Sequence, residues 1–581
     1  MRRLILPVVC VCVLAGGVAP AASAGPTGRP NIVFVLTDDQ RWDTLDTMPI
    51  VTRELVHHGV TFTNAFAVNP LCCPSRSSIL TGRYSHSTGV YSNTVPYGGA
   101  SWFDDDSTIA TWLHNGGYRT GYIGKYMNGY NRTWVPPGWD RWIGFDGGFF
   151  NYGLNIDGTN VLYGAADTDY STDVLTDKSV AFMNGVPTGQ PFFLVYAPFA
   201  PHTPATPAPR DVGTFPGLRD WRPPSYDEDD ISDKPRWLRK RPHLTADDMA
   251  RMDGLRLHEL QSLQAVDDGV GRILDTLTSL GVLENTIVVF MSDNGLLWGE
   301  HRQIDRKVSA FEESIRIPLV VRYDAVLGRR ARTESRLVTN LDLAPTFAAL
   351  GGVKAPAVEG RSLLPLLGAD PPGPAQGWRS SFTLEHLRGA GGAAAEVTSY
   401  CGTRRTNWKY VVYSTHEEEL YDLAGDRYEL VNRAADPTLR PLLLSMRRQT
   451  KAGCAPPPPG MGLDWLCTVE ANGTSKLAGT SGEDTICGGP VGERITAGPG
   501  DDVVRADGGG DVVDGGRGDD QLTGGAGRDV ILGSYGADIV FARDGVRDRI
   551  DCGRGYDVAI VDRGDEVKRC EVVRRPGKPR A

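Results

Sequence analysis

Oxygen-bearing side chains stand at the ends of two apolar runs in this chain. The runs Asn31–Thr37 and Thr286–Ser292 have the length and composition of buried strands. Asp38 and Asp39 follow the first run, and Asp293 and Asn294 follow the second. Four oxygen ligands from two strand ends would suit a hard divalent cation such as Ca²⁺. Each pair taken alone is equally compatible with helix caps or turns, where Asp and Asn are also common.

The elements that must position these residues alternate along the first 350 residues. Further strands are expected at 192–196 and 317–321, and a helix at 343–350. A long helix should begin at the capping box of Thr245 and Asp248 and end at Gly281. Alternating strands and helices predict an α/β fold, with a large, mostly parallel sheet sandwiched by helices. Ligands of such sheets bind beyond the carboxyl ends of the strands, which is where both oxygen-bearing pairs would lie.

A cysteine-containing segment gives these pairs a chemical context. Residues 71–76 are Leu-Cys-Cys-Pro-Ser-Arg, and residues 80–83 are Leu-Thr-Gly-Arg. This resembles the signature of the formylglycine-dependent (type I) sulfatases, Cys-x-Pro-x-Arg with a downstream Leu-Thr-Gly-Arg. Only Cys72 has Pro74 and Arg76 at the required offsets; the alternative is a buried or disulfide-bonded pair of cysteines. The resemblance covers residues 29–435 and implies an alkaline-phosphatase-like fold with a small α+β C-terminal subdomain.

The resemblance also implies a ligand set and a mechanism. Asp38, Asp39, Asp293 and Asn294 match the calcium ligands of the family, and the modified Cys72 would join them. A formylglycine-generating enzyme would convert Cys72 to formylglycine, whose hydrated aldehyde is the nucleophile. Its second hydroxyl lets the sulfated intermediate collapse and release sulfate, an exit that a thiol does not offer.

Four further residues match the charged groups of the family site. By this resemblance Arg76 orients the formylglycine, and Lys125 and Lys307 contact the sulfate. His202, within Ala-Pro-His-Thr-Pro, matches the histidine that protonates the leaving alcohol. Taken one by one, the lysines could be solvated and the histidine structural.

One position departs from many arylsulfatases. Met127 stands where they carry a histidine, which leaves the base for the formylglycine hydrate unassigned. His301 could contact substrate but is equally compatible with an exposed loop, and the expected site does not include it. The run Gly-Lys-Tyr-Met-Asn at 124–128 resembles instead the glucosamine-6-sulfatase and extracellular heparan-sulfatase branch. The expected substrate is therefore a sulfated carbohydrate, a polysaccharide containing 6-O-sulfated glucosamine. The alternatives are a phosphonate or phosphodiester hydrolase of the same superfamily and a non-catalytic, calcium-dependent surface- or polysaccharide-binding protein.

A repeat of nine residues occupies the C-terminal part of the chain. Its aspartates each follow a glycine two residues earlier, at Asp502, Asp511, Asp520, Asp529 and Asp538. The pattern resembles the RTX (hemolysin-type) calcium-binding nonapeptide of parallel β-rolls, rather than a flexible Gly/Asp linker. Glycines permit the tight turns, and aspartates and turn carbonyls would hold several Ca²⁺ ions. Such a tail has little core, so we expect it to fold only with calcium; Asp548 and Asp557 suggest a looser continuation.

Composition and the N-terminus narrow the class and the compartment. The chain has 581 residues, a net charge of −10 and a hydrophobic share of 40%, which together exclude a disordered chain and disfavour a nucleic-acid partner. Arg2 and Arg3 precede an apolar stretch at 4–18 that is too short to span a membrane, and Ala-Ser-Ala follows at 22–24. This predicts a signal peptide and a secreted, extracellular protein without a membrane span, in which disulfides can form. Cys552 and Cys570 are the expected pair.

These features divide the chain into five expected parts, with a tail that could attach the protein to a cell surface. They are a signal peptide at 1–24, a sulfatase catalytic domain at 29–375, a small C-terminal subdomain at 376–450, a Pro-rich linker at 451–480 and the repeat region at 481–581.

Overall fold

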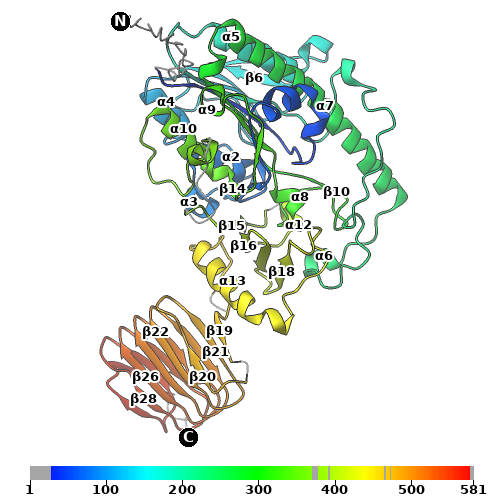
Figure 1. Cartoon of the computed structure of the whole chain (residues 1–581). Coiled ribbons are helices and arrows are strands. Elements are labelled where there is room, and N and C mark those ends of the chain that lie inside the picture. Colours follow the sequence, from blue (N-terminus) through cyan, green and yellow to red (C-terminus); the bar gives the residue numbers. More distant parts are fainter. Residues whose placement is uncertain (1–27, 369–376, 390–392, 464–465, 472, 576–581) are drawn as a thin grey trace, which may run out of the picture.

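The computed structural model describes residues 28–368, 377–389, 393–463, 466–471 and 473–575. The expected signal peptide lies outside the described residues. Figure 1 shows a large α/β part, a small sheet with helix α13 below it, and a two-sheet roll at the C-terminal end. In the described part of the chain, no helix combines the length and apolar character needed to cross a bilayer.

The large part is built on a ten-stranded sheet in the order β13-β2-β12-β9-β1-β8-β4-β5-β6-β7. Its centre is parallel and consists of β9 (Thr286–Ser292), β1 (Asn31–Thr37), β8 (Phe192–Ala197), β4 (Arg119–Lys125) and β5 (Arg141–Phe145). The strand expected at 317–321 is present as β12 (Leu319–Arg322), but it runs antiparallel to β9. The remaining strands are β2 (Val60–Phe62), β13 (Arg332–Glu334), β6 (Gly153–Ile156) and β7 (Thr159–Leu162).

Helices cover both faces of this sheet because its central strands are apolar on both sides. In β1, Ile32 and Phe34 pack in one core with residues of α2 (Cys72–Thr81), α4 (Ile109–Asn115) and α10 (Leu343–Gly351). Val33 and Val35 face the other core, with α5 (Ser171–Asn184) and α7 (Ala246–Ser279) (Figure 1). The capping box predicted for α7 is present.

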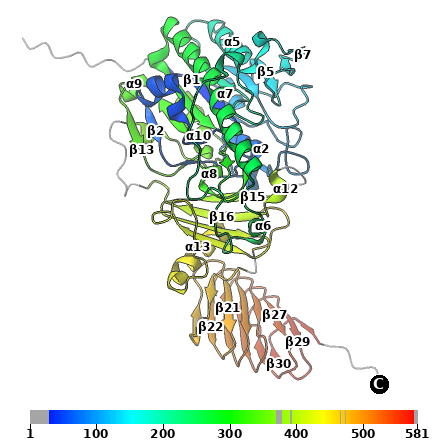
Figure 2. The same ribbon diagram turned by 90° about the vertical axis from the view of Figure 1, so that its right-hand side faces the viewer.

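The small part is a four-stranded antiparallel sheet with one helix against it. Its strands are β15 (Ser381–His386), β16 (Tyr400–Arg405), β17 (Trp408–Tyr413) and β18 (Glu418–Asp422), and the helix is α13 (Arg440–Gly453). A disulfide between Cys401 and Cys454 joins β16 to the end of α13. Figure 2 shows α13 between this sheet and the roll.

The roll consists of two parallel sheets that enclose a thin apolar core. One sheet holds β19, β21, β23, β25, β27, β29 and β31, and the other holds β20, β22, β24, β26, β28 and β30, from β19 (Val469–Glu470) to β31 (Val572–Arg574). Val504 and Leu522, which are 18 residues apart, pair in the first sheet, so that two nonapeptides make one turn. The predicted disulfide Cys552–Cys570 is confirmed, and a further one joins Cys467 to Cys487.

The roll begins before residue 481. β19 and β20 (Lys476–Ala478) lie in the stretch expected to be a linker, yet each pairs in register with the next strand of its sheet. The first turn lacks the Gly/Asp pattern but supplies the apolar Val469 and Leu477 to the core, so composition did not reveal it.

Candidate active site

The two oxygen-bearing strand ends lie side by side. β1 and β9 are neighbours, and Thr37 pairs with Ser292 at their carboxyl ends. The main-chain N–H of Asp39 donates to Asp293 Oδ1 over 3.1 Å, and Asn294 Nδ2 donates to Asp39 Oδ1 over 2.7 Å. Asp38, Asp39, Asp293 and Asn294 are all buried. The parallel register of two neighbouring strands therefore builds the cluster that the sequence predicted.

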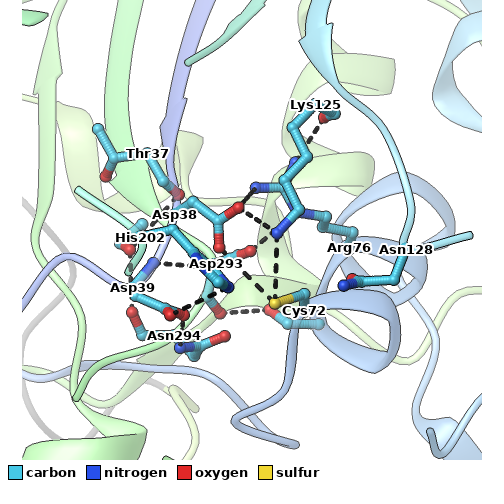
Figure 3. Close-up of polar contacts among 12 residues, drawn as sticks. Thr37, Asp38, Asp39, Cys72, Arg76, Lys125, Asn128, His202, Asp293 and Asn294 are labelled. Atoms are coloured by element: carbon cyan, nitrogen blue, oxygen red, sulfur yellow. Dashed lines mark hydrogen bonds and ion pairs between the residues drawn. The ribbon is translucent and has the colours of Figure 1, made fainter. Parts of the chain in front are cut away.

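Cys72 reaches the same edge from the start of α2. It is fully buried, and its Sγ lies 3.6 Å from Asp38 Oδ1. Arg76 is one helical turn later and on the same face of α2. Its Nε donates to Asp293 Oδ2 over 2.8 Å and its Nη1 donates to the carbonyl of Lys125 over 2.6 Å. Arg76 thus ties the helix that carries Cys72 to the ends of β9 and β4 (Figure 3).

Two buried lysines flank the thiol. Lys125 ends β4 and its Nζ lies 3.6 Å from Cys72 Sγ; Lys307 follows β11 (Ile304–Arg306) and its Nζ lies 3.1 Å away. Lys125 forms an ion pair with Asp38, and Lys307 with Asp39. Burial alone would lower the pKa of both lysines, but these carboxylates outweigh it and hold each pKa above its ordinary value. Both ammonium groups therefore stay charged beside Cys72.

His202 occupies the more open side of the cluster. Its Nδ1 lies 2.7 Å from the carbonyl oxygen of Thr203, so Nδ1 is the donor there, and its Nε2 lies 3.6 Å from Asp39 Oδ2. The imidazole is 25% exposed and stacks on Phe199. Burial would lower the pKa of His202, but Asp39 outweighs it and raises that pKa above its ordinary value. The ring can thus carry a proton at Nε2.

The donor atoms fit a calcium ion. Ligand atoms of Asp38, Asp39, Cys72 and His202 all lie within 4.8 Å of one another. Within the described residues, Asn294 Oδ1 is buried without a hydrogen-bond partner, which leaves it free to ligate. A thiol is a soft ligand that Ca²⁺ does not prefer, whereas an oxygen at position 72 would complete an oxygen-rich set.

Apart from any proton on His202, the charges of the cluster balance without a metal. Three carboxylates, Asp38, Asp39 and Asp293, face the three cations Arg76, Lys125 and Lys307. A bound Ca²⁺ would leave at least two positive charges in excess. The cluster would then attract an anionic group to Cys72.

Neither Met127 nor His301 supplies a base beside Cys72. Met127 is fully buried in the apolar core between the sheet and α2. His301 is also buried, with its Nδ1 2.6 Å from Glu228 and its ring stacked on Phe311, and burial lowers its pKa to about 3. His301 is therefore neither an exposed loop residue nor a member of this cluster.

Two asparagines that sequence reasoning missed hold the residue next to Cys72. The main-chain N–H of Asn128 donates to Cys73 Sγ over 3.2 Å, and Asn93 Oδ1 accepts the N–H of Cys73 over 2.9 Å. Asn128 lies in the Gly-Lys-Tyr-Met-Asn run that the sequence singled out, but Asn93 has no such signal.

In the roll, the predicted aspartates form ladders along the two edges. Each is buried and precedes a strand, and its Oδ1 accepts the main-chain N–H of the acidic residue one turn earlier, as Asp520 does from Asp502 over 2.8 Å. Within the described chain, Oδ2 has no hydrogen-bond partner in these five aspartates or in two that follow them. The seven are Asp502, Asp511, Asp520, Asp529, Asp538, Asp548 and Asp557. These atoms fit the calcium ions that the repeat predicts.

The ladders also contain acidic residues outside the five predicted aspartates. Asp484 and Glu493 donate from their main-chain N–H to Asp502 and Asp511, and Asp548 donates to Asp565. Asp484 and Glu493 continue the spacing of nine before Asp502, but position 493 carries a glutamate and lacks the glycine two residues earlier.

A buried cysteine at a helix start, flanked by lysines and carboxylates at the edge of an α/β sheet, suits an enzyme that cleaves anionic esters. The sequence matches the sulfatase family over residues 30–353 and the C-terminal part of N-sulphoglucosamine sulphohydrolase over 299–453. It also matches the RTX calcium-binding nonapeptide repeat over 488–522, 514–546 and 523–559. The chain therefore belongs to the sulfatase family, a family of sulfuric ester hydrolases, and carries an RTX repeat tail.

Known proteins of this kind are similar over the first two parts of the chain. The "Extracellular sulfatase SULF-1 homolog" of Drosophila melanogaster is 36% identical over 61% of this chain, which spans only 33% of that relative. Human N-acetylglucosamine-6-sulfatase is 32% identical, over 65% of this chain and 71% of the relative. A solved structure in complex with its substrate D-glucosamine-2-N,6-O-disulfate has a TM-score of 0.64 and 26% identity, and covers 74% of this chain and 98% of the other.

Proposed function

We propose that the chain is a secreted, calcium-dependent sulfatase that removes sulfate from 6-O-sulfated glucosamine residues of a polysaccharide or its fragments. The observation that carries this is the pair of buried, charged lysines within 3.6 Å of Cys72 Sγ, which is where a sulfate group would need cationic contacts. The similarity to glucosamine-6-sulfatases supports the choice of sugar.

The roles of the residues follow from their positions. Asp38, Asp39, Asp293 and Asn294, with position 72, would hold the calcium ion. A formylglycine-generating enzyme is a required partner, because formylglycine at position 72 supplies a hydrated aldehyde as nucleophile.

The cationic side chains have separate roles around the sulfate ester. Lys125 and Lys307 bind the sulfate oxygens, and Arg76 fixes the orientation of the α2 N-terminus through Asp293. His202 donates its Nε2 proton to the leaving sugar oxygen, because this nitrogen faces the cluster while Nδ1 is occupied by Thr203.

The rest of the chain would place this activity outside the cell. We propose the catalytic domain at 29–375 and the subdomain at 376–450 as the enzyme, and the roll as a calcium-dependent module for attachment to a surface or polysaccharide.

The first experiment is a peptide mass spectrum of the secreted protein across Cys72. A loss of about 18 Da, the change from thiol to aldehyde that formylglycine chemistry requires, is expected. The same preparation is then given N-acetylglucosamine 6-sulfate, an aryl sulfate and an aryl phosphonate, with C72A as the inactive control. Faster turnover of the phosphonate would favour the hydrolase alternative, and an unmodified Cys72 in the native host would favour a binding protein.

A further inference from the structure

A hollow lies where the large part of the chain meets the small sheet. It has a volume of about 320 Å³, at the lower end of the range of ligand pockets, roughly 300–1,000 Å³. Four arginines and two tryptophans are among its lining residues: Arg41, Arg316, Arg404, Arg427, Trp42 and Trp221. None of the candidate catalytic or calcium-binding residues lines it. The hollow is therefore separate from the Cys72 site.

Two of the four arginines are neutralised by carboxylates of the same hollow. Arg41 forms a two-pronged pair with Asp43, with contacts of 3.0 and 2.8 Å, and a further ion pair with the buried Glu300 over 3.0 Å. Arg404 forms another with Glu312, with contacts of 2.9 and 3.0 Å. The third carboxyl group, Glu313, is buried, and burial raises its pKa to about 8, so it is mostly uncharged at neutral pH. These acidic side chains therefore leave two of the four arginines without a carboxylate partner.

The two arginines without a carboxylate partner are Arg316 and Arg427. Within the described residues, no carboxylate lies within 4 Å of either guanidinium, and the Nη1 of Arg316 makes no hydrogen bond. Arg316 is instead held by the carbonyl of Thr63 and by stacking 4.1 Å from the ring of Trp42. Arg427 is exposed and lies 4.6 Å over the ring of Tyr428. Stacking fixes both guanidinium planes and leaves donor groups available to an anion.

The hollow is close enough to the Cys72 site to meet the same substrate chain. The segment after β1 supplies Asp39 to the site and Arg41 to the hollow, and two residues span at most about 7 Å. The segment from Lys307 to Arg316 likewise contributes to both.

We propose that this hollow is a subsite for a second anionic group, a sulfate or carboxylate, carried by a neighbouring sugar of the polysaccharide whose ester reacts at Cys72. The proposal rests on the proposed function for its substrate class. A subsite of this kind would make the enzyme prefer chains over single sulfated sugars, because a lone sugar cannot occupy both places.

Binding can be measured without turnover, which separates this proposal from the proposed function. The full-length C72A protein is titrated calorimetrically with a size-defined heparin tetrasaccharide. The titration is repeated with three variants of the C72A protein: R427Q, the double variant R316Q/R427Q, and R330Q. R330Q is a matched control that removes an exposed arginine elsewhere. We expect affinity to fall two- to fivefold in R427Q and at least tenfold in the double variant, and to stay unchanged in R330Q. Added salt should weaken binding more in C72A than in the double variant.

Two further arms identify the group bound and guard against misfolding. Tetrasaccharides that keep the reacting 6-O-sulfate but lack either the other sulfates or the carboxylates show which anion the hollow takes, since only the relevant loss should mimic R427Q. In the Cys72-containing enzyme, R427Q should raise KM for the tetrasaccharide and leave kcat and KM for glucosamine 6-sulfate unchanged. Because Arg427 is exposed, we expect R427Q to keep the fold even if R316Q does not. Wild-type affinity in R427Q and the double variant, or no tetrasaccharide binding by C72A, would overturn the proposal.

Discussion

Removing calcium should unfold the roll and leave the rest of the chain intact. Seven ladder aspartates each bury a carboxylate oxygen that has no hydrogen-bond partner in the described chain. An unsatisfied buried polar group costs about 1–3 kcal/mol, so seven cost on the order of 10 kcal/mol together. This matches the whole stability of a typical domain, about 5–15 kcal/mol. The thin core between the two sheets cannot offset such a cost without bound cations.

The assay is limited trypsin digestion of the full-length protein with calcium and with a chelator. The roll carries many arginines, among them Arg494 and Arg549, which are exposed on its outer faces. We expect these sites to resist cleavage in calcium and to be cut in chelator, leaving a resistant fragment that ends near α13. A roll that stays equally resistant in chelator would refute the reasoning, because its buried carboxylates would then need no ion.

Substitution of one ladder residue tests the same reasoning from the other side, because it removes a buried charge from the calcium-free roll. D520N keeps an oxygen that can accept the N–H of Asp502 but removes the buried charge. We expect a higher calcium concentration for folding in D520N, and a roll without calcium that is no less stable than wild type. Asp514 lies outside the ladders and accepts from Ser534, so D514N is the matched control and should fold at the wild-type calcium concentration.

Three other perturbations address the enzyme part. His86 contacts the buried Glu385 of β15, and although burial opposes its charge, Glu359 and Glu385 raise its pKa to about 9. This contribution is complete below about pH 6.5 and is lost as pH rises through 9, so H86Q should cost about 1–2 kcal/mol of stability at pH 6 and little at pH 10, as measured by urea denaturation. M127H should not raise sulfatase activity and should lower stability by about 1–3 kcal/mol, because the imidazole would be buried in the apolar core; a rise in kcat would contradict this placement. Replacing the Cys401–Cys454 disulfide by serines opens a loop of 53 residues and should cost up to about 4 kcal/mol, visible as a lower Tm.

The strand ends of the site could be predicted because their signal is local. Asn31–Thr37 and Thr286–Ser292 were expected as strands and are strands at those bounds. The rule that ligands bind at the carboxyl edge of a parallel sheet then placed Asp38 and Asp293 together. The positions of Lys125, His202 and Lys307 came instead from the family resemblance, since nothing in their spacing indicates that they converge on Cys72.

The roll shows where a local pattern stops being informative. Its predicted aspartates lie in the ladders, but the composition of the first turn predicts a linker, because the residues before Asp484 lack the Gly/Asp pattern. What makes that turn part of the roll is the register of Val469 with Ile486, a contact between residues 17 apart that composition does not encode.

The arginine-rich hollow could not be predicted from the sequence, because it too depends on contacts between residues that are far apart in the chain. Its walls come from the segments 41–43, 221–223, 312–316 and 404–428, and its charge is decided by which carboxylate each arginine meets after folding. In the sequence, Arg316 stands close to Glu312 and Glu313 and would be expected to be neutralised by them. In the fold, Glu312 pairs with Arg404 from another domain, and Glu313 is buried so that it keeps its proton. The charge balance around Arg316 is thus set where the small sheet meets the large part, and R404Q, which would free Glu312, should neutralise Arg316 and weaken the subsite.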